Sequence, residues 1–254
     1  MSTLSSQAKK TVQQEVRKSI GTRGPKETGN NLNHLLNTLF NNVTQQILIQ
    51  CKNKWVQSHL LDTETKTKLK TVSTTDELFS ILISNVVLMD TLVLVSNSFS
   101  QVKKSFNGGI FADSVREILN EGFKVMGLPL KSHTSGNVIS KFKKKLSSIT
   151  DGLKPDVDMV IENTLTGEII CIISCKTSLF ERITQTITWK SKLEIGGCSL
   201  PIVAVTQQSF GGINIERVKS LDSTFVCDPT MNEYEKIFKF EKLFDYLSKI
   251  NSVK

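Results

Sequence analysis

Two short apolar runs joined by a compact turn constrain the fold of this chain more than any other part of its sequence. The runs extend from Val157 to Glu162 and from Glu168 to Ser174, and both are rich in valine and isoleucine. The segment between them carries Asn163 and Gly167, residue types that favour a tight turn. This pattern predicts a β-hairpin, in which residues equally far from the turn face one another across the two strands.

Strands and helices alternate through the rest of the C-terminal half. This alternation predicts an α/β fold with a central mixed β-sheet flanked by helices. Further strands are predicted at Pro201 to Thr206 and at Thr224 to Cys227. Helices are predicted at Asp113 to Glu121 with Gly122 just beyond the end, at Ser178 to about Leu193, at Ile213 to Lys219 and at Tyr234 to Ile250.

The first hundred residues have a different, helical character. Residues 1–30 are basic and contain the segment GTRGPKETG, which interrupts a helix, so they predict a flexible arm or linker. Apolar residues at helical spacing predict an amphipathic helix from Leu32 to Leu48, and a second helical segment starts near Thr75. We therefore expect a helical region over residues 31–105 and a separate domain over residues 106–254.

The charge of the chain suits a polyanionic partner. Its 32 Lys and Arg residues exceed its 24 Asp and Glu residues, which gives a net charge of +8. Neutralising phosphates with such a surplus releases counterions and favours binding to nucleic acid. A general solubility charge would give the same count, so charge alone leaves both explanations open.

The cysteines and the hydropathy pattern predict a cytoplasmic protein without a membrane span. The five cysteines are an odd number and include no pair with zinc-site or disulfide spacing, which favours a reducing compartment. The N-terminus is polar and basic without an apolar stretch behind it. The longest apolar stretch, Leu78 to Val95, contains Asp90 and is better explained as a buried helix.

An acidic and a basic residue stand at the open end of the predicted hairpin. Asp156 lies at the start of the first strand and Lys176 at the end of the second, so the hairpin would make them neighbours. A carboxylate together with backbone carbonyl oxygens can hold Mg²⁺. A nearby ammonium group can position an attacking water or ease its deprotonation. The pair therefore indicates phosphodiester hydrolysis.

These residues resemble the PD-(D/E)xK signature of type II restriction endonucleases. Pro155-Asp156 and then Ser174-Cys175-Lys176 lie on a hairpin that is followed by a helix, and the resemblance spans roughly residues 106–230. It implies Mg²⁺-dependent cleavage of double-stranded DNA at a short specific sequence by a homodimer, leaving 5′-phosphate ends. It also implies a metal site formed by Asp156 and the Cys175 backbone carbonyl, with Lys176 as a catalytic residue, and a cognate DNA methyltransferase in the same system.

The chain departs from the signature at Ser174, where the family pattern has Asp or Glu. Some restriction enzymes that resemble this chain have serine there and use a glutamate from elsewhere in the fold. Glu117 is the favoured replacement as a catalytic and metal-binding residue, while Glu121 and Glu194 remain alternatives. Asp158 is a further possible metal ligand, because it lies on the same face of the strand as Asp156.

The start of the following helix carries residue types that can read DNA bases. Thr177 and Ser178 can cap the helix. Arg182 can bind guanine with two hydrogen bonds, Glu181 can accept a hydrogen bond from cytosine, and Gln185 can pair with adenine. The same residues could equally form a solvent-facing surface of the helix.

A dense run of lysines precedes the hairpin. Such a run can contact DNA phosphates without regard to sequence, although it is also typical of a solvated surface. The run contains Lys141, Lys143, Lys144 and Lys145.

Two other functions remain open. A repair or recombination nuclease with the same core would share the catalytic pair but not depend on a short DNA sequence. A basic DNA-binding protein without catalysis would explain Ser174 as the trace of a lost carboxylate. Digestion of phage DNA separates the three, because only a restriction enzyme produces discrete fragments.

Overall fold

The computed structural model describes residues 2–39, 56, 62–72, 77, 80–81, 108–149, 157–177, 183–207, 218 and 220–252. The chain divides into two compact units, one of residues 1–11 and 37–107 and the other of residues 12–36 and 108–254. In the first unit, helix α4 (Thr63–Thr71) begins after Asp62, whose side chain accepts a hydrogen bond from the Thr65 amide at 2.7 Å. No described helix is long and apolar enough to cross a membrane.

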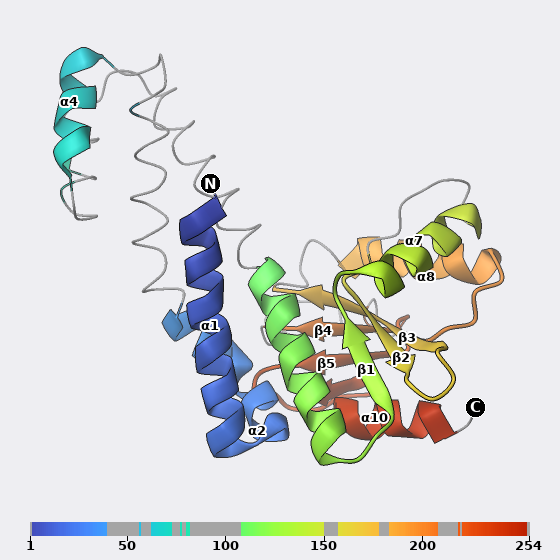
Figure 1. Ribbon diagram of the computed structural model, residues 1–254. Helices are drawn as coiled ribbons and strands as arrows, with labels where there is room; N and C mark the ends of the chain where they lie inside the picture. The colour runs from blue at the N-terminus through green and yellow to red at the C-terminus, as the bar shows by residue number, and fades with distance from the viewer. Residues whose placement is uncertain are drawn as a thin grey trace. The chain divides into compact units, whose positions relative to one another are not determined.

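A six-stranded mixed sheet forms the centre of the second unit (Figure 1). The strands lie in the sheet in the order of the sequence; β1 to β3 are antiparallel, and β3 to β6 are parallel. The strands are β1 (Leu130–His133), β2 (Met159–Asn163), β3 (Ile169–Lys176), β4 (Ile202–Thr206), β5 (Ser223–Val226) and β6 (Ile237–Lys239).

The predicted hairpin is confirmed as β2 and β3. Met159 pairs with Ile173, so residues equally far from the turn do face one another. The side chain of Asn163 accepts hydrogen bonds from the amides of Leu165 and Thr166 at 2.8 and 3.2 Å, and Gly167 adopts a positive φ of 70°. Asn163 thus closes the turn through its side-chain hydrogen bonds, and Gly167 closes it by adopting a positive φ, as these residue types favour.

Helices cover both faces of the sheet, which confirms the predicted α/β fold (Figure 1). On one face lie α7 (Asn137–Ile149) and α8 (Ile183–Ile195), where Phe142 and Leu193 share a buried cluster with Ile172 of β3. On the other face lies α10 (Lys242–Ser252), whose Tyr246 ring contacts Phe225 of β5. Because β3 is buried by helices and by neighbouring strands, seven consecutive residues from Ile170 to Lys176 are buried.

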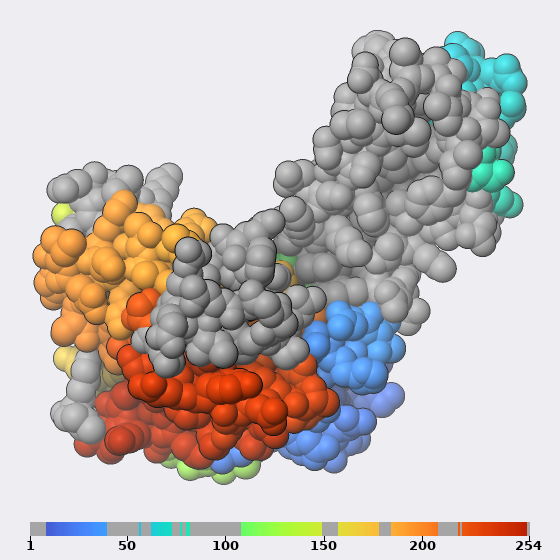
Figure 2. All heavy atoms as spheres, turned by 180° about the vertical axis from the view of Figure 1, so that it is seen from behind, coloured from blue at the N-terminus to red at the C-terminus, as the bar shows by residue number. Residues whose placement is uncertain are grey.

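The N-terminal segment is helical, and the predicted flexible arm over residues 1–30 is wrong. It forms α1 (Ser2–Arg23) and α2 (Pro25–Asn30), separated at Gly24, where φ is 80°. Asn30 makes two 2.9 Å hydrogen bonds with the side chain and amide of Glu241. Seen from behind in Figure 2, these N-terminal residues (blue) lie against the C-terminal segment (red). The Gly-Pro break therefore turns the chain between two packed helices.

Gly122 does not end its helix as predicted. The helix covers residues 108–125. The chain then leaves the helix through Gly127, which has a φ of 63°. The amide of Leu128 bonds the Phe123 carbonyl at 2.9 Å, and the amide of Gly127 bonds the Lys124 carbonyl at 3.2 Å. This is the usual pattern of a glycine-terminated helix.

The predicted helix from Tyr234 to Ile250 is wrong in its first part. Residues Ile237–Lys239 form β6, which pairs in parallel with β5, and the helix starts only at Lys242. Lys236 has a positive φ of 61°, which is incompatible with a continuous helix. Pairing with β5 gives these backbone groups partners that the helical pattern could not reveal.

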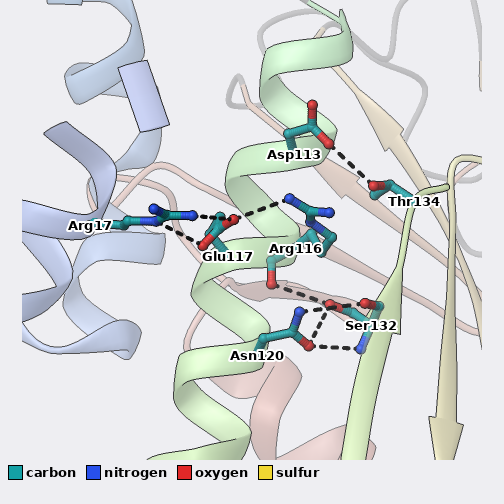
Figure 3. Close-up of polar contacts among 7 residues, drawn as sticks. All are labelled: Arg17, Asp113, Arg116, Glu117, Asn120, Ser132 and Thr134. Atoms are coloured by element: carbon teal, nitrogen blue, oxygen red, sulfur yellow. Dashed lines mark hydrogen bonds and ion pairs between the residues drawn. The ribbon is translucent and has the colours of Figure 1, made fainter. Parts of the chain in front are cut away.

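Strand β1 and helix α7 were not predicted. The four residues of β1 form an outer strand of the sheet, and the side chain of Asn120 contacts the backbone of Ser132 in this strand (Figure 3). Its Oδ1 accepts a hydrogen bond from the Ser132 amide at 2.8 Å, and its Nδ2 donates to the Ser132 carbonyl at 3.5 Å. The predicted helices near residue 75 and at 213–219 lie largely outside the described residues.

Candidate active site

The end of β3 and the entry to β2 bring together a carboxylate and a lysine. Because Met159 pairs with Ile173, the preceding residue Asp158 comes opposite Ser174. Asp158 Oδ2 accepts hydrogen bonds from Lys176 Nζ at 3.0 Å, from the Cys175 amide at 2.8 Å and from Ser174 Oγ at 3.4 Å. The acid that contacts Lys176 among the described residues is therefore Asp158.

Burial differs sharply between the two members of this pair. The Lys176 side chain is 2% exposed, while that of Asp158 is 26% exposed. A buried ammonium group requires a charged or strongly polar partner, which Asp158 provides. All three bonds to the carboxylate use Oδ2, and Oδ1 has no hydrogen-bond partner within the described residues. One oxygen thus anchors the carboxylate, and the other is available to a ligand.

A second hydroxyl lies behind Ser174. Ser174 is 1% exposed and Thr186, on the first turn of α8, is 4% exposed. Their hydroxyl oxygens are 3.3 Å apart. The helix that follows the hairpin is thereby joined by a hydrogen bond to the strand that carries Lys176.

Cys175 separates Ser174 from Lys176 and contributes no thiolate. Burial raises the pKa of its thiol well above the ordinary value, and the negative charge of Asp158 raises it further. The charge of Asp113, on the helix over residues 108–125, acts in the same direction. The Cys175 side chain is therefore a neutral, buried group, and its amide is the atom that contacts Asp158.

The donor set fits a hard divalent cation. The described residues contain no group of three or more His, Cys, Asp or Glu side chains arranged to hold a metal ion. Mg²⁺ is ordinarily held by one or two carboxylates together with water and substrate phosphate oxygens. A single carboxylate with one oxygen available matches that requirement, whereas a zinc site would need more protein ligands.

Several predicted site residues lie outside the described residues, namely Asp156, Ser178, Glu181 and Arg182. The expected contact between Asp156 and Lys176 therefore stays a prediction. Of the described ones, Thr177 is half-buried directly after β3, and Gln185 is exposed near the start of α8. On α7, Lys141, Lys144 and Lys145 are exposed, and Lys143 is half-buried.

Glu117 has arginine partners (Figure 3). Arg17 of α1 contacts both of its carboxylate oxygens, at 3.2 and 3.1 Å, and Arg116 contacts one of them at 3.1 Å. Among the described residues it has no hydrogen bond to Asp158, Ser174 or Lys176. The contacts of Glu117 thus join α1 to the helix over residues 108–125.

Glu194, one of the alternatives to Glu117, also lies in different surroundings. Glu194 is 58% exposed and pairs with Lys190 at 3.6 Å. It lies eight residues after Thr186, or about 12 Å further along α8. On the helix over residues 108–125, Asp113 is the carboxylate whose charge reaches Cys175, and its Oδ1 accepts a hydrogen bond from Thr134 at 3.2 Å.

Two features of the site were missed in the sequence. Asp158 was considered only as an additional ligand, although counting outward from the turn places it opposite Ser174. Its contact with Lys176 is diagonal, and diagonal neighbours lie within reach of a long side chain. No sequence signal pointed to Thr186, because its role depends on how α8 packs on the sheet.

Residues 138–249 match the family described as BsaWI restriction endonuclease type 2. The expected resemblance is thus confirmed for that segment, which includes Asp158, Ser174 and Lys176.

Two solved structures are similar to the chain. A pre-specific complex of restriction endonuclease BsaWI with DNA has a TM-score of 0.44 and 10% identity, covering 98% of this chain and 92% of that one. A specific complex of restriction endonuclease AgeI with DNA has a TM-score of 0.45 and 16% identity, covering 80% of this chain and 91% of that one. A comparison with curated protein sequences gave no match.

Proposed function

We propose that this protein is a Mg²⁺-dependent endonuclease that cuts double-stranded DNA at a short specific sequence. The observation that carries the proposal is the contact of Asp158 with Lys176, at 3.0 Å, inside the segment that matches a restriction endonuclease family. A carboxylate with a free oxygen beside a buried ammonium group is suited to phosphodiester hydrolysis.

Asp158 would hold Mg²⁺ through Oδ1, with Asp156 and the Cys175 carbonyl as further candidate ligands. When bound, the metal ion would stabilise the negative charge that develops on the phosphate oxygens. Lys176, held by Oδ2 of Asp158, would orient the attacking water and stabilise it as its proton leaves. Attack at phosphorus would release the 3′ oxygen and leave the 5′ phosphate. A second carboxylate would come from the helix over residues 108–125, from Asp113 or from Glu117 after release of its arginines.

Basic and polar residues next to this site would bind the DNA. The exposed lysines of α7 would contact phosphates, because a flexible ammonium group requires no particular base. Gln185 is exposed near the start of α8 and would face a base edge together with Glu181 and Arg182. Thr177 and Ser178 would contact the backbone between the catalytic strand and this helix.

The nature of the target suggests the partners of the protein. Both strands of a symmetric duplex can be cut by two copies of one chain related by a twofold axis, so we propose a homodimer. A nuclease that reads a short sequence would also damage the DNA of its own cell. We therefore propose a cytoplasmic protein that acts with a DNA methyltransferase of the same specificity.

Digestion of phage DNA tests the proposed function. Purified protein with Mg²⁺ should produce discrete fragments, and EDTA should prevent their formation because it removes the metal ion. Lys176→Met keeps most of the apolar length but removes the ammonium group, so it should lower the cleavage rate about a hundredfold or more. The matched control is Lys131→Met, at an exposed position of β1, which should cut like the parent.

Other outcomes would identify the alternative functions. A smear, or nicking that depends on DNA structure, would indicate a nuclease without sequence specificity. DNA binding without any cutting in Mg²⁺ would indicate a non-catalytic binding protein. Undiminished cleavage by Lys176→Met would remove the proposed site even if the protein proved to be a nuclease.

A further inference from the structure

We propose that Thr186 is a positioning residue of the active site that holds the Asp158 carboxylate through Ser174. The inference rests on the proposed nuclease function of the same site. It gives Ser174, which stands where the signature has a carboxylate, a role of its own.

The direction of the two hydrogen bonds follows from proton counting. A serine hydroxyl has one proton to donate, and an ionised carboxylate can only accept. Ser174 Oγ donates to Asp158 Oδ2 over 3.4 Å, so its proton is committed. In the proposed arrangement, Thr186 Oγ1, 3.3 Å away, is the donor to Ser174 Oγ. The two hydroxyls form a chain that runs from α8 to the carboxylate.

Burial protects these two hydrogen bonds from exchange with water. Ser174 and Thr186 are 1% and 4% exposed, so water cannot readily replace either bond. Without the Thr186 proton, the Ser174 oxygen would lose a donor and its hydroxyl could rotate away from Asp158. The carboxylate would then keep the bonds from Cys175 and Lys176 but lose the third contact that fixes its plane. The direction of Oδ1, the oxygen offered to a metal ion, would become less well defined.

The same two hydrogen bonds would connect DNA contact at α8 with catalysis at Asp158. Thr186 follows Gln185, which is exposed on α8, and Leu193 of the same helix is packed in the cluster shared with β3. A displacement of α8 by DNA would therefore reach Asp158 through two hydrogen bonds. Thr186 itself touches neither DNA nor the scissile phosphate in this proposal.

Matched threonine variants provide the test. Thr186→Val replaces the hydroxyl with a methyl group, and Thr186→Ser restores the hydroxyl. Thr188→Val is the control, because the Thr188 hydroxyl lies on the same helix but bonds the Thr184 carbonyl at 2.8 Å. Single-turnover cleavage would be measured on a duplex that contains the site found by phage DNA digestion. DNA affinity would be measured without divalent ions, and Mn²⁺ binding to the free protein would be followed by electron paramagnetic resonance.

Thr186→Val should slow single-turnover cleavage roughly fivefold to tenfold, the effect expected from one lost hydrogen bond. It should weaken Mn²⁺ binding and leave the metal-free DNA affinity within about twofold of the parent. Thr186→Ser should restore both properties, and Thr188→Val should change neither. The double variant Ser174→Ala with Thr186→Val should be no slower than Ser174→Ala alone, because both changes break one chain.

Failure of this inference is distinguishable from failure of the proposed function. If the parent cuts no DNA in Mg²⁺, the nuclease proposal itself fails. If the parent cuts and Thr186→Val matches it in rate and Mn²⁺ affinity, only the role of Thr186 is overturned. A loss of cleavage rate in Thr186→Val that Thr186→Ser does not restore also contradicts the role of Thr186. So does a loss that adds fully to the loss caused by Ser174→Ala. Should Thr186→Val not fold, Thr186→Ala removes the same hydroxyl and is judged by the same comparison.

Discussion

Asp158 shows how strand register decides which side chain contacts Lys176. Asp156 and Asp158 are two residues apart, so they are close to equivalent in the sequence. The pairing of Met159 with Ile173 places Asp158 opposite Ser174 and within 3.0 Å of Lys176 Nζ. The Cys175 amide also donates to Asp158, and this contact depends on backbone geometry rather than on residue type.

Substitution of each aspartate should separate their roles. Asp158→Asn keeps the size of the side chain but removes its charge, so it should reduce cleavage about a hundredfold or more while DNA binding without metal persists. Asp156→Asn, assayed in parallel, reports whether the neighbouring carboxylate is a second ligand. Thermal unfolding should accompany both assays, because Lys176 is buried and loses its charged partner in Asp158→Asn.

Cleavage by Asp158→Asn at the parental rate, together with loss of cleavage in Asp156→Asn, would show that the described contact is structural. The metal ligand would then be Asp156, as the sequence pattern first suggested.

At the scale of elements, two glycines set how closely helices approach the aromatic residues of the C-terminal segment. A Cβ atom added at Gly122 would lie 2.0 Å from the ring of Phe244, and one added at Gly29 would lie 2.0 Å from the ring of Phe240. Phe240 and Phe244 are fully buried and form an edge contact with ring centroids 6.0 Å apart. The absence of side chains at the two glycines thus allows both helices to pack on these rings.

Alanine at Gly122 should therefore destabilise the protein although it favours helix formation. The Phe244 ring would have to move, which costs about 1–3 kcal/mol in the free energy of unfolding. Gly21→Ala is the matched control, because nothing lies within 4 Å of a Cβ at this exposed helical position. It should stabilise the protein by about 0.5–1 kcal/mol. Urea unfolding measures both, and a stabilising effect at Gly122 would contradict the described packing.

At the scale of the whole molecule, buried thiols make the stability sensitive to alkaline pH. Burial is the main cause that raises the pKa of Cys171 and of Cys227 above the ordinary value. The folded chain therefore keeps protons that the unfolded chain releases above its thiol pKa of about 8.5. The contribution of these thiols to the free energy of unfolding is complete below about pH 8.5. It is lost as the pH rises from there toward the thiol pKa of the folded protein.

The free energy of unfolding should fall between pH 7 and pH 10, by about 2 kcal/mol for each such thiol. Urea titrations at the two pH values measure the change. Cys171→Val removes one titrating group and preserves an apolar side chain, so its loss between the two pH values should be about 2 kcal/mol smaller. Equal losses in the parent and the variant would show that Cys171 does not contribute.

Local patterns predicted the hairpin and the strands β4 and β5, because each depends on residues close together in the sequence. The apolar runs and the turn residues identified β2 and β3 independently of the rest of the chain. Strand β6 was not predicted, since its backbone partners lie on β5 and its composition continues the pattern of α10. The spacing of Val138, Phe142 and Leu146 does indicate helix α7. Only its lysines were interpreted, as possible contacts to DNA phosphates.

Other features of the structure depend on contacts between distant segments. Glu117 was favoured for its place on a helix before the hairpin, and its partner Arg17 is 100 residues away. The packed N-terminal helices escaped prediction for a similar reason, because Asn30 bonds Glu241 near the other end of the chain. Patterns within a short window cannot report such pairs.

The Asn120 amide on Ser132 has a consequence for how copies of this protein meet. Outermost strands with vacant amides and carbonyls can act as templates on which other chains assemble into fibrils. At β1, the side chain of Asn120 already occupies this pair of backbone groups. In the proposed homodimer, the two copies should therefore dock through surfaces other than a sheet continued across β1.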